Sequence, residues 1–284
     1  HGAVTLFGER LFAYPGFAAS YLAPWAHRTV LRVPRVRSIV FGAVGPQNEA
    51  LRTAGSGRHM QRLQPWVRGN SPARRTAPIG PADYARRMDR TLLPVDGQQL
   101  AVVDEGSGDP VVMIHGFPEL AYSWRHQIPS LAAAGFRAIA YDQRGYGESS
   151  KPHDVDAYPL TNLAADAVGL LDVLGLERAT FVGHDWGSIV VWTAALMYPE
   201  RVEKVVSLNV PYRGWCAGFP STDVIRDKLT DRFGYVLAFQ ELGVTEAAFE
   251  ADPDAWLRAV YLGIAADRTF MTDDDFATYR DAFV

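Results

Sequence analysis

The stretch Gly183-His184-Asp185-Trp186-Gly187 decides how this chain folds and what chemistry it carries. A buried-strand pattern, 179–182, precedes it, and a helix pattern, 188–198, follows it. Glycines on both sides of an acidic residue permit a sharp strand-to-helix turn, in which the backbone is strained and crowded. Such a turn presents its central side chain as a nucleophile. The alternative is that Asp185 is only an acidic residue that caps the helix, but this leaves the flanking glycines unexplained.

Composition narrows the class of protein. The chain has 284 residues, of which 48% are hydrophobic, enough for one sizeable domain or for one domain plus a small second one. Its single cysteine, Cys216, excludes a disulfide framework and a cysteine-based metal site. We find no run of about 18 apolar residues and no signal-peptide layout. We therefore expect a cytoplasmic protein with no membrane partner, no metal and no cofactor.

Charge divides the chain near residue 87. Residues 1–87 contain 13 Arg, no Lys and 3 acidic residues, for a net charge of +10, whereas the remainder has a net charge of -14. The first part has no sustained strand or helix period. It is interpreted as a basic arm, a disordered extension, or a translation product of GC-rich DNA that is not natural protein. No nucleic-acid-binding motif appears, so no nucleic-acid partner is expected. The chain begins with His1, and we expect a fragment or a processed product.

From Met88 the pattern becomes regular. Apolar strand patterns alternate with helix patterns up to residue 210, which predicts an α/β core with a parallel sheet and helices on both faces. The expected strands are 91–95, 99–104, 111–114, 136–141, 179–182 and 202–208, with helices at 124–134, 163–174 and 188–198. Asp96-Gly97 predicts a hairpin turn between the first two strands.

Helical patterns dominate from 211 to 284, and we interpret this block as a partial cap domain inserted after the core. The expected helices are 224–229, 233–242, 245–251, 254–265 and 272–283. Thr272 and Asp275 resemble a capping box in which Asp replaces the usual Glu.

Two loops follow strands of the core. H-G-F-P at 115–118 comes after one of them, and D-Q-R-G-Y-G-E-S at 142–149 after another. The second loop is interpreted as a packed turn whose Asp and Arg tie neighbouring segments together. Phosphate binding there is disfavoured because the G-x-x-x-x-G-K-[ST] pattern is absent.

Taken together, these motifs resemble the epoxide hydrolases of the α/β-hydrolase superfamily. The resemblance runs from about Thr91 to Val284 and rests on a set of motifs that is specific only in combination. They are H-G-F-P-E (115–119), S-W-R-H-Q (123–127), D-Q-R-G-Y-G-E-S-S-K-P (142–152), G-H-D-W-G (183–187) and F-G-Y-V-L-A-F-Q (233–240). It implies an α/β-hydrolase core whose sheet is incomplete at the C-terminus, with a partial helical cap.

The resemblance implies a two-step hydrolysis of a small-molecule epoxide to a diol. Asp185 would attack an epoxide carbon and form an alkyl–enzyme ester, while Tyr235 gives a proton to the ring oxygen. The N–H groups of Phe117 and Trp186 would form the oxyanion hole when the ester is hydrolysed. Phe117, Trp186, Tyr235 and Phe239 would line an apolar substrate pocket. Without the resemblance, Tyr235 is better interpreted as a tyrosine of the cap–core contact.

The second step needs a histidine base with an acidic partner. The histidines are at 1, 27, 59, 115, 126, 153 and 184, and none has the family's position. We expect this chain to stall at the ester, and we expect the second cap tyrosine to lie beyond its end. Two alternatives stay open: a haloalkane dehalogenase, in which Asn is common where this chain has Phe117, and a non-catalytic binding protein of the same fold. The sequence does not indicate an oligomeric state.

Overall fold

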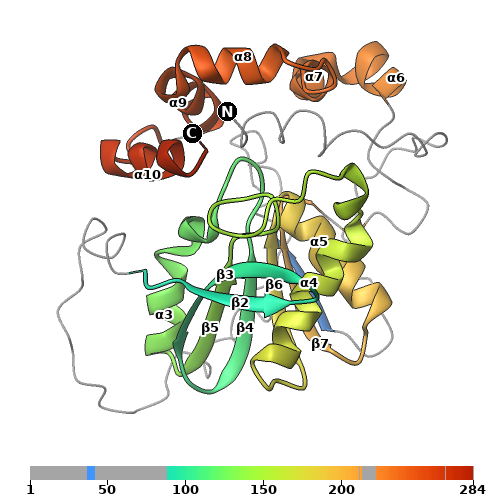
Figure 1. Cartoon of the computed structure of the whole chain (residues 1–284), viewed down its shortest axis with the longest axis vertical. Helices are drawn as coiled ribbons and strands as arrows, with labels where there is room; N and C mark the ends of the chain where they lie inside the picture. The colour runs from blue at the N-terminus through green and yellow to red at the C-terminus, as the bar shows by residue number, and fades with distance from the viewer. Residues whose placement is uncertain (1–36, 42–87, 211, 213–221, 266, 284) are drawn as a thin grey trace, which may run out of the picture.

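The computed structural model describes residues 37–41, 88–210, 212, 222–265 and 267–283. A seven-stranded sheet in the order β1-β7-β6-β4-β5-β3-β2 forms the core, with helices on both faces (Figure 1). The predicted α/β architecture is confirmed. The strands are β1 (Arg37–Phe41), β2 (Thr91–Val95), β3 (Gln98–Gly106), β4 (Asp109–Ile114), β5 (Phe136–Tyr141), β6 (Ala179–His184) and β7 (Val202–Leu208).

Most of the sheet is parallel. Strand β4 pairs in parallel with β5 and β6, and β7 pairs in parallel with β6 and β1. The β2–β3 hairpin is antiparallel, and β3 also runs antiparallel to β5. The hairpin turns at Asp96 and Gly97, whose φ angles of 45° and 78° are both positive, as in the two-residue turns that match strand twist.

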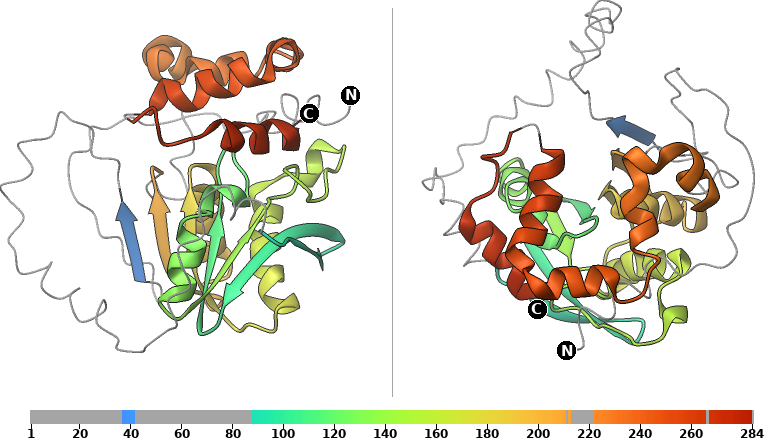
Figure 2. Two further views of the ribbon diagram at one scale, coloured as in Figure 1. Left: turned by 90° about the vertical axis from the view of Figure 1, so that its left-hand side faces the viewer. Right: turned by 90° about the horizontal axis from the view of Figure 1, so that it is seen from above.

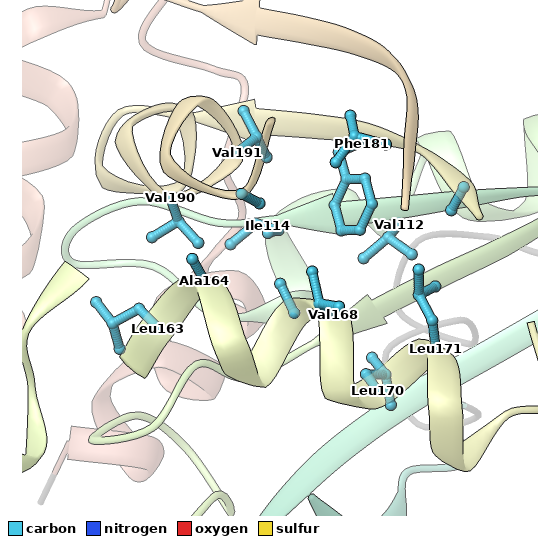
Figure 3. Packing of buried hydrophobic residues seen from close by; sticks show 14 of the residues in the cluster. Val112, Ile114, Leu163, Ala164, Val168, Leu170, Leu171, Phe181, Val190 and Val191 are labelled. Atoms are coloured by element: carbon cyan, nitrogen blue, oxygen red, sulfur yellow. The ribbon is translucent and has the colours of Figure 1, made fainter. Parts of the chain in front are cut away.

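Helices α4 (Leu160–Val173) and α5 (Trp186–Met197) cover one face of the sheet. Their apolar side chains pack on the strands, as Leu171 of α4 and Val190 of α5 do in the same cluster as Phe181 of β6 (Figure 3). The other face carries α3 (Gln127–Ala133) and the short turn η4 (Ala121–Trp124), whereas the short turn η5 (Val155–Ala157) leads into α4. The continuous helix expected over 124–134 is wrong. Pro129 has no N–H to donate to the Arg125 carbonyl, so it is tolerated only in the first turn of a helix, and α3 begins at Gln127.

A second helical layer lies over the carboxyl ends of the strands (Figures 1 and 2). It contains α6 (Thr222–Val224), the π-helical turn η6 (Ile225–Leu229), α7 (Thr230–Ala238), α8 (Val244–Ala251), α9 (Pro253–Ile264) and α10 (Asp273–Phe283). The predicted capping box is confirmed. Thr272 N–H donates to the Asp275 carboxylate over 2.7 Å, and Asp275 N–H donates to the Thr272 hydroxyl over 3.2 Å.

Strand β1 was not expected, since it lies within the segment 1–87 that shows no period. It pairs with β7 over its whole length, from Arg37 beside Lys204 to Phe41 beside Leu208. Its apolar residues Ile39, Val40 and Phe41 are good strand formers. The remaining predictions for residues 1–36 and 42–87 lie outside the described residues, so the domain boundaries stay a prediction.

The loop after β5 is a packed turn, as its sequence predicts. Asp142 accepts the N–H groups of Ala121 and Glu148 over 2.8 and 3.3 Å. Arg144 forms a bidentate ion pair with Asp166 of α4, with both N···O distances 2.6 Å and both side chains buried. The loop therefore ties η4 to α4.

Candidate active site

Asp185 occupies a strained turn between β6 and α5. Its φ of 51° and ψ of -118° are rare for a residue with a Cβ. The turn closes through a 2.9 Å bond from Ser188 N–H to the Asp185 carbonyl. A side chain at Gly183 would collide with the backbone of Gly187, so only glycine fits there. The predicted strand-to-helix turn is confirmed, with Asp185 at its tip.

The loop after β4 approaches the same carboxylate from the other side. A Cβ on Gly116 would lie 2.5 Å from the Cβ of Asp185, so glycine is required for this close approach. Phe117 N–H donates to Asp185 Oδ1 over 3.1 Å. The backbone N–H of Trp186 also bonds to the Asp185 carboxylate. The structure thus brings both predicted oxyanion donors to the predicted nucleophile.

Burial controls the charge of this carboxylate. Desolvation raises the pKa of Asp185 above its ordinary value, although the N–H groups of Trp186 and Phe117 and the nearby His184 oppose that rise. A carboxylate held in a poorly hydrated site by fixed N–H groups is suited to nucleophilic attack once ionised.

A hydrogen-bonded row of side chains, which sequence reasoning missed, joins the two loops. Glu119 Oε2 accepts Gly116 N–H over 2.9 Å and lies 2.9 Å from His184 Nδ1. His184 Nε2 lies 2.7 Å from the Asn209 amide. Burial disfavours the charged forms of Glu119 and His184, but the contact between the two side chains outweighs this effect. The Glu119 carboxylate raises the pKa of His184, and His184 lowers the pKa of Glu119.

An aromatic wall stands beside the nucleophile. The Phe117 ring lies edge-on to Phe239 of α7 at 5.3 Å and to Trp256 of α9 at 6.4 Å. Tyr235 lies 5.6 Å from Phe239 and is half exposed. Burial and then the charge of Asp185 raise the pKa of Tyr235, which therefore keeps its proton. Trp256 was missed because its helix pattern looks the same as that of any packed helix.

The described histidines have other partners. His115 is fully buried, with Nδ1 2.8 Å from the Gly116 carbonyl and Nε2 accepting Gln143 N–H over 3.0 Å. Burial lowers the pKa of His115 and keeps it neutral. Within the part of the chain that the structure describes, no cluster of His, Cys, Asp or Glu could hold a metal ion. Among those residues, none of the helices has both the length and the apolar character to cross a bilayer.

Comparison with known proteins assigns this geometry to a family. A model of the alpha/beta hydrolase fold matches residues 109–261. The crystal structure of Epoxide Hydrolase A from Mycobacterium thermoresistibile superposes with a TM-score of 0.62 at 39% identity, covering 69% of this chain and 71% of that one. The chain belongs to the epoxide hydrolases of the α/β-hydrolase fold. The epoxide hydrolase VrEH1 from Vigna radiata gives a TM-score of 0.61 at 32% identity, covering 70% and 68% of the two chains.

Curated relatives agree with this family. Epoxide hydrolase A of Mycobacterium tuberculosis is 49% identical over 175 residues, which are 61% of this chain and 54% of that protein. Bifunctional epoxide hydrolase 2 of Sus scrofa is 47% identical over 188 residues, 66% of this chain and 33% of that protein. The chain therefore spans about half the length of the first relative and a third of the second.

Proposed function

We propose that Asp185 opens epoxides by forming an alkyl–enzyme ester, the first step of their hydrolysis to diols. One carboxylate oxygen attacks a ring carbon, the bond from that carbon to the ring oxygen breaks, and the ring oxygen takes the proton of Tyr235. The product of this step is a 2-hydroxyalkyl ester of Asp185. The observation that carries the proposal is the convergence of Phe117 N–H, at 3.1 Å, and Trp186 N–H on this strained carboxylate.

The surroundings suit a small apolar epoxide. Phe117, Phe239 and Trp256 offer ring faces and edges to an apolar substituent. Tyr235 stands on the same wall as a neutral donor, which is what an alkoxide leaving group requires. In ester hydrolysis, the N–H groups of Phe117 and Trp186 would hold the oxyanion, each contributing about 2.7–4 kcal/mol.

We further propose that the ester formed by this sequence persists. Water attack on the ester needs a base, and His115 and His184 are both engaged in the hydrogen bonds described above. The remaining described histidines are His126, just before α3, and His153, in the segment between β5 and α4. With His115 and His184 engaged in other bonds, we expect an adduct to accumulate instead of turning over.

Intact-mass spectrometry after incubation with styrene oxide tests both statements. We expect the protein to gain the mass of one epoxide, and peptide mapping to place it on Asp185. Asp185→Asn is the matched control, because Asn tolerates a positive φ and lacks the nucleophilic charge. Absence of both adduct and diol, or an adduct with 1-bromohexane alone, would overturn the proposed reaction. Steady diol production by the same chain would overturn the proposed persistence of the ester.

A further inference from the structure

Tyr261 joins the helical layer to the loop that carries Phe117. Its hydroxyl donates to the carbonyl oxygen of Pro118 over 2.6 Å, across 143 positions of sequence. The side chain is buried. Burial raises the pKa of this hydroxyl well above its usual range, so it stays protonated and remains a donor.

The Tyr261 hydroxyl is held firmly from the side of the helical layer. Its ring lies 5.1 Å from the Tyr279 ring and 6.3 Å from the Phe276 ring, both on α10. Helix α10 in turn bonds to the core, where Asp275 accepts the Tyr122 hydroxyl over 2.7 Å. A donor fixed in this way can fix its acceptor.

The acceptor belongs to the residue that follows the oxyanion donor. Glu119 fixes the loop at Gly116 through a 2.9 Å bond, and the Glu119 N–H donates to the Gly116 carbonyl over 3.2 Å. Both bonds close the loop on itself. The bond from Tyr261 to the Pro118 carbonyl acts from outside, next to the residue whose N–H reaches Asp185.

We propose that Tyr261 is a positioning residue, through which the helical layer holds the Phe117 N–H against Asp185. This inference rests on the proposed epoxide opening for its kinetic consequence. Tyr261 touches no reacting atom, so its loss should change the rate of ester formation at saturation and leave epoxide binding nearly unchanged.

The experiment compares Tyr261→Phe with Tyr158→Phe. Each variant keeps its ring and loses one hydroxyl that donates to a proline carbonyl, the second being the 2.8 Å bond from Tyr158 to Pro152 in the loop before α4. Adduct formation is followed by intact mass over a range of styrene oxide concentrations. For Tyr261→Phe we expect the saturating rate to fall about tenfold, less than the 10²–10³-fold seen when such a donor is deleted. The half-saturating concentration should stay within about twofold, and Tyr158→Phe should match the wild type in both.

Hydrogen exchange of the peptide 115–120 gives a second reading that needs no reaction. Exchange of the loop amides should speed up in Tyr261→Phe and stay unchanged in Tyr158→Phe, with matched urea midpoints. Equal effects of both variants on rate and exchange would overturn the proposal. An unreactive wild type would refute the epoxide opening, and the exchange result alone would then decide the role of Tyr261.

Discussion

Asp275 is the residue whose loss should most weaken the attachment of α10 to the core. Its carboxylate accepts the Tyr122 hydroxyl at 2.7 Å and lies 3.1 Å from Arg125 Nε. It also accepts the N–H and hydroxyl of Thr272, each over 2.7 Å. Asp275→Ala removes all of these bonds and leaves the guanidinium of Arg125, whose side chain is 8% exposed, without its counter-charge.

The expected loss has two parts. Breaking a buried ion pair from one side costs about 3–5 kcal/mol, because the remaining charge is left uncompensated. Loss of the capping box costs about 1 kcal/mol more. The free energy of unfolding should therefore fall by about 4–6 kcal/mol for Asp275→Ala. The double variant Arg125→Met with Asp275→Ala removes the stranded charge, so it should recover a large part of that loss.

Urea unfolding followed by tryptophan fluorescence measures these values, because Trp124 lies in η4 and Trp256 in α9 on the two sides of this contact. Asp281→Ala on the same helix is the control, since the exposed Asp281 carboxylate pairs with the neighbouring Arg280 over 2.8 Å and an exposed pair contributes little. A loss below about 1.5 kcal/mol for Asp275→Ala, or a double variant as unstable as the single one, would refute the view that a buried charge pair holds α10.

Three further predictions concern the nucleophile and its neighbours. The rate of adduct formation should fall as pH drops through the raised pKa of Asp185, because only the ionised carboxylate attacks; a rate that does not change on the acid side would contradict this. Burial lowers the pKa of His184, but the contact with Glu119 outweighs it and raises that pKa above its ordinary value. The stabilisation from this pair is therefore complete below the ordinary histidine pKa, and it is lost as the pH rises through the pKa of His184 in the folded protein. Urea titrations should show that decline in the wild type and a flatter profile in Glu119→Gln. Gly116→Ala should slow adduct formation about 10²–10³-fold, since the new Cβ would lie 2.5 Å from that of Asp185, whereas Gly263→Ala, with open space around its Cβ position, should not.

Local sequence patterns predict much of this fold, because the decisive signals are short. Glycines around Asp185, the Asp96-Gly97 turn and the Thr272–Asp275 box each depend on a few neighbouring residues, and each is present in the structure. The helix start that was predicted wrongly, that of α3, also has a local cause in Pro129.

Long-range contacts explain what sequence reasoning missed. The pairing of β1 with β7 joins residues far apart in the chain and follows no periodic pattern. Glu119, Trp256 and Tyr261 show no signal of their own, because their roles arise only when the fold brings them to the β4 loop. Glu119 was visible within the H-G-F-P-E motif, but its partner His184 could not be read from spacing.

The strained turn alone does not orient the nucleophile. Backbone strain fixes the Cα and Cβ of Asp185, yet the carboxylate can still rotate about its side-chain bonds. Phe117 N–H stops that rotation at Oδ1, so the reactive oxygen is as well placed as the loop that carries Phe117. That loop is held to the turn by the contact between Glu119 and His184 and to the helical layer by Tyr261. Loosening either contact should therefore lower the reactivity of Asp185 while leaving its strained φ unchanged, and a structure of the Tyr261→Phe variant would show whether φ and Oδ1 respond separately.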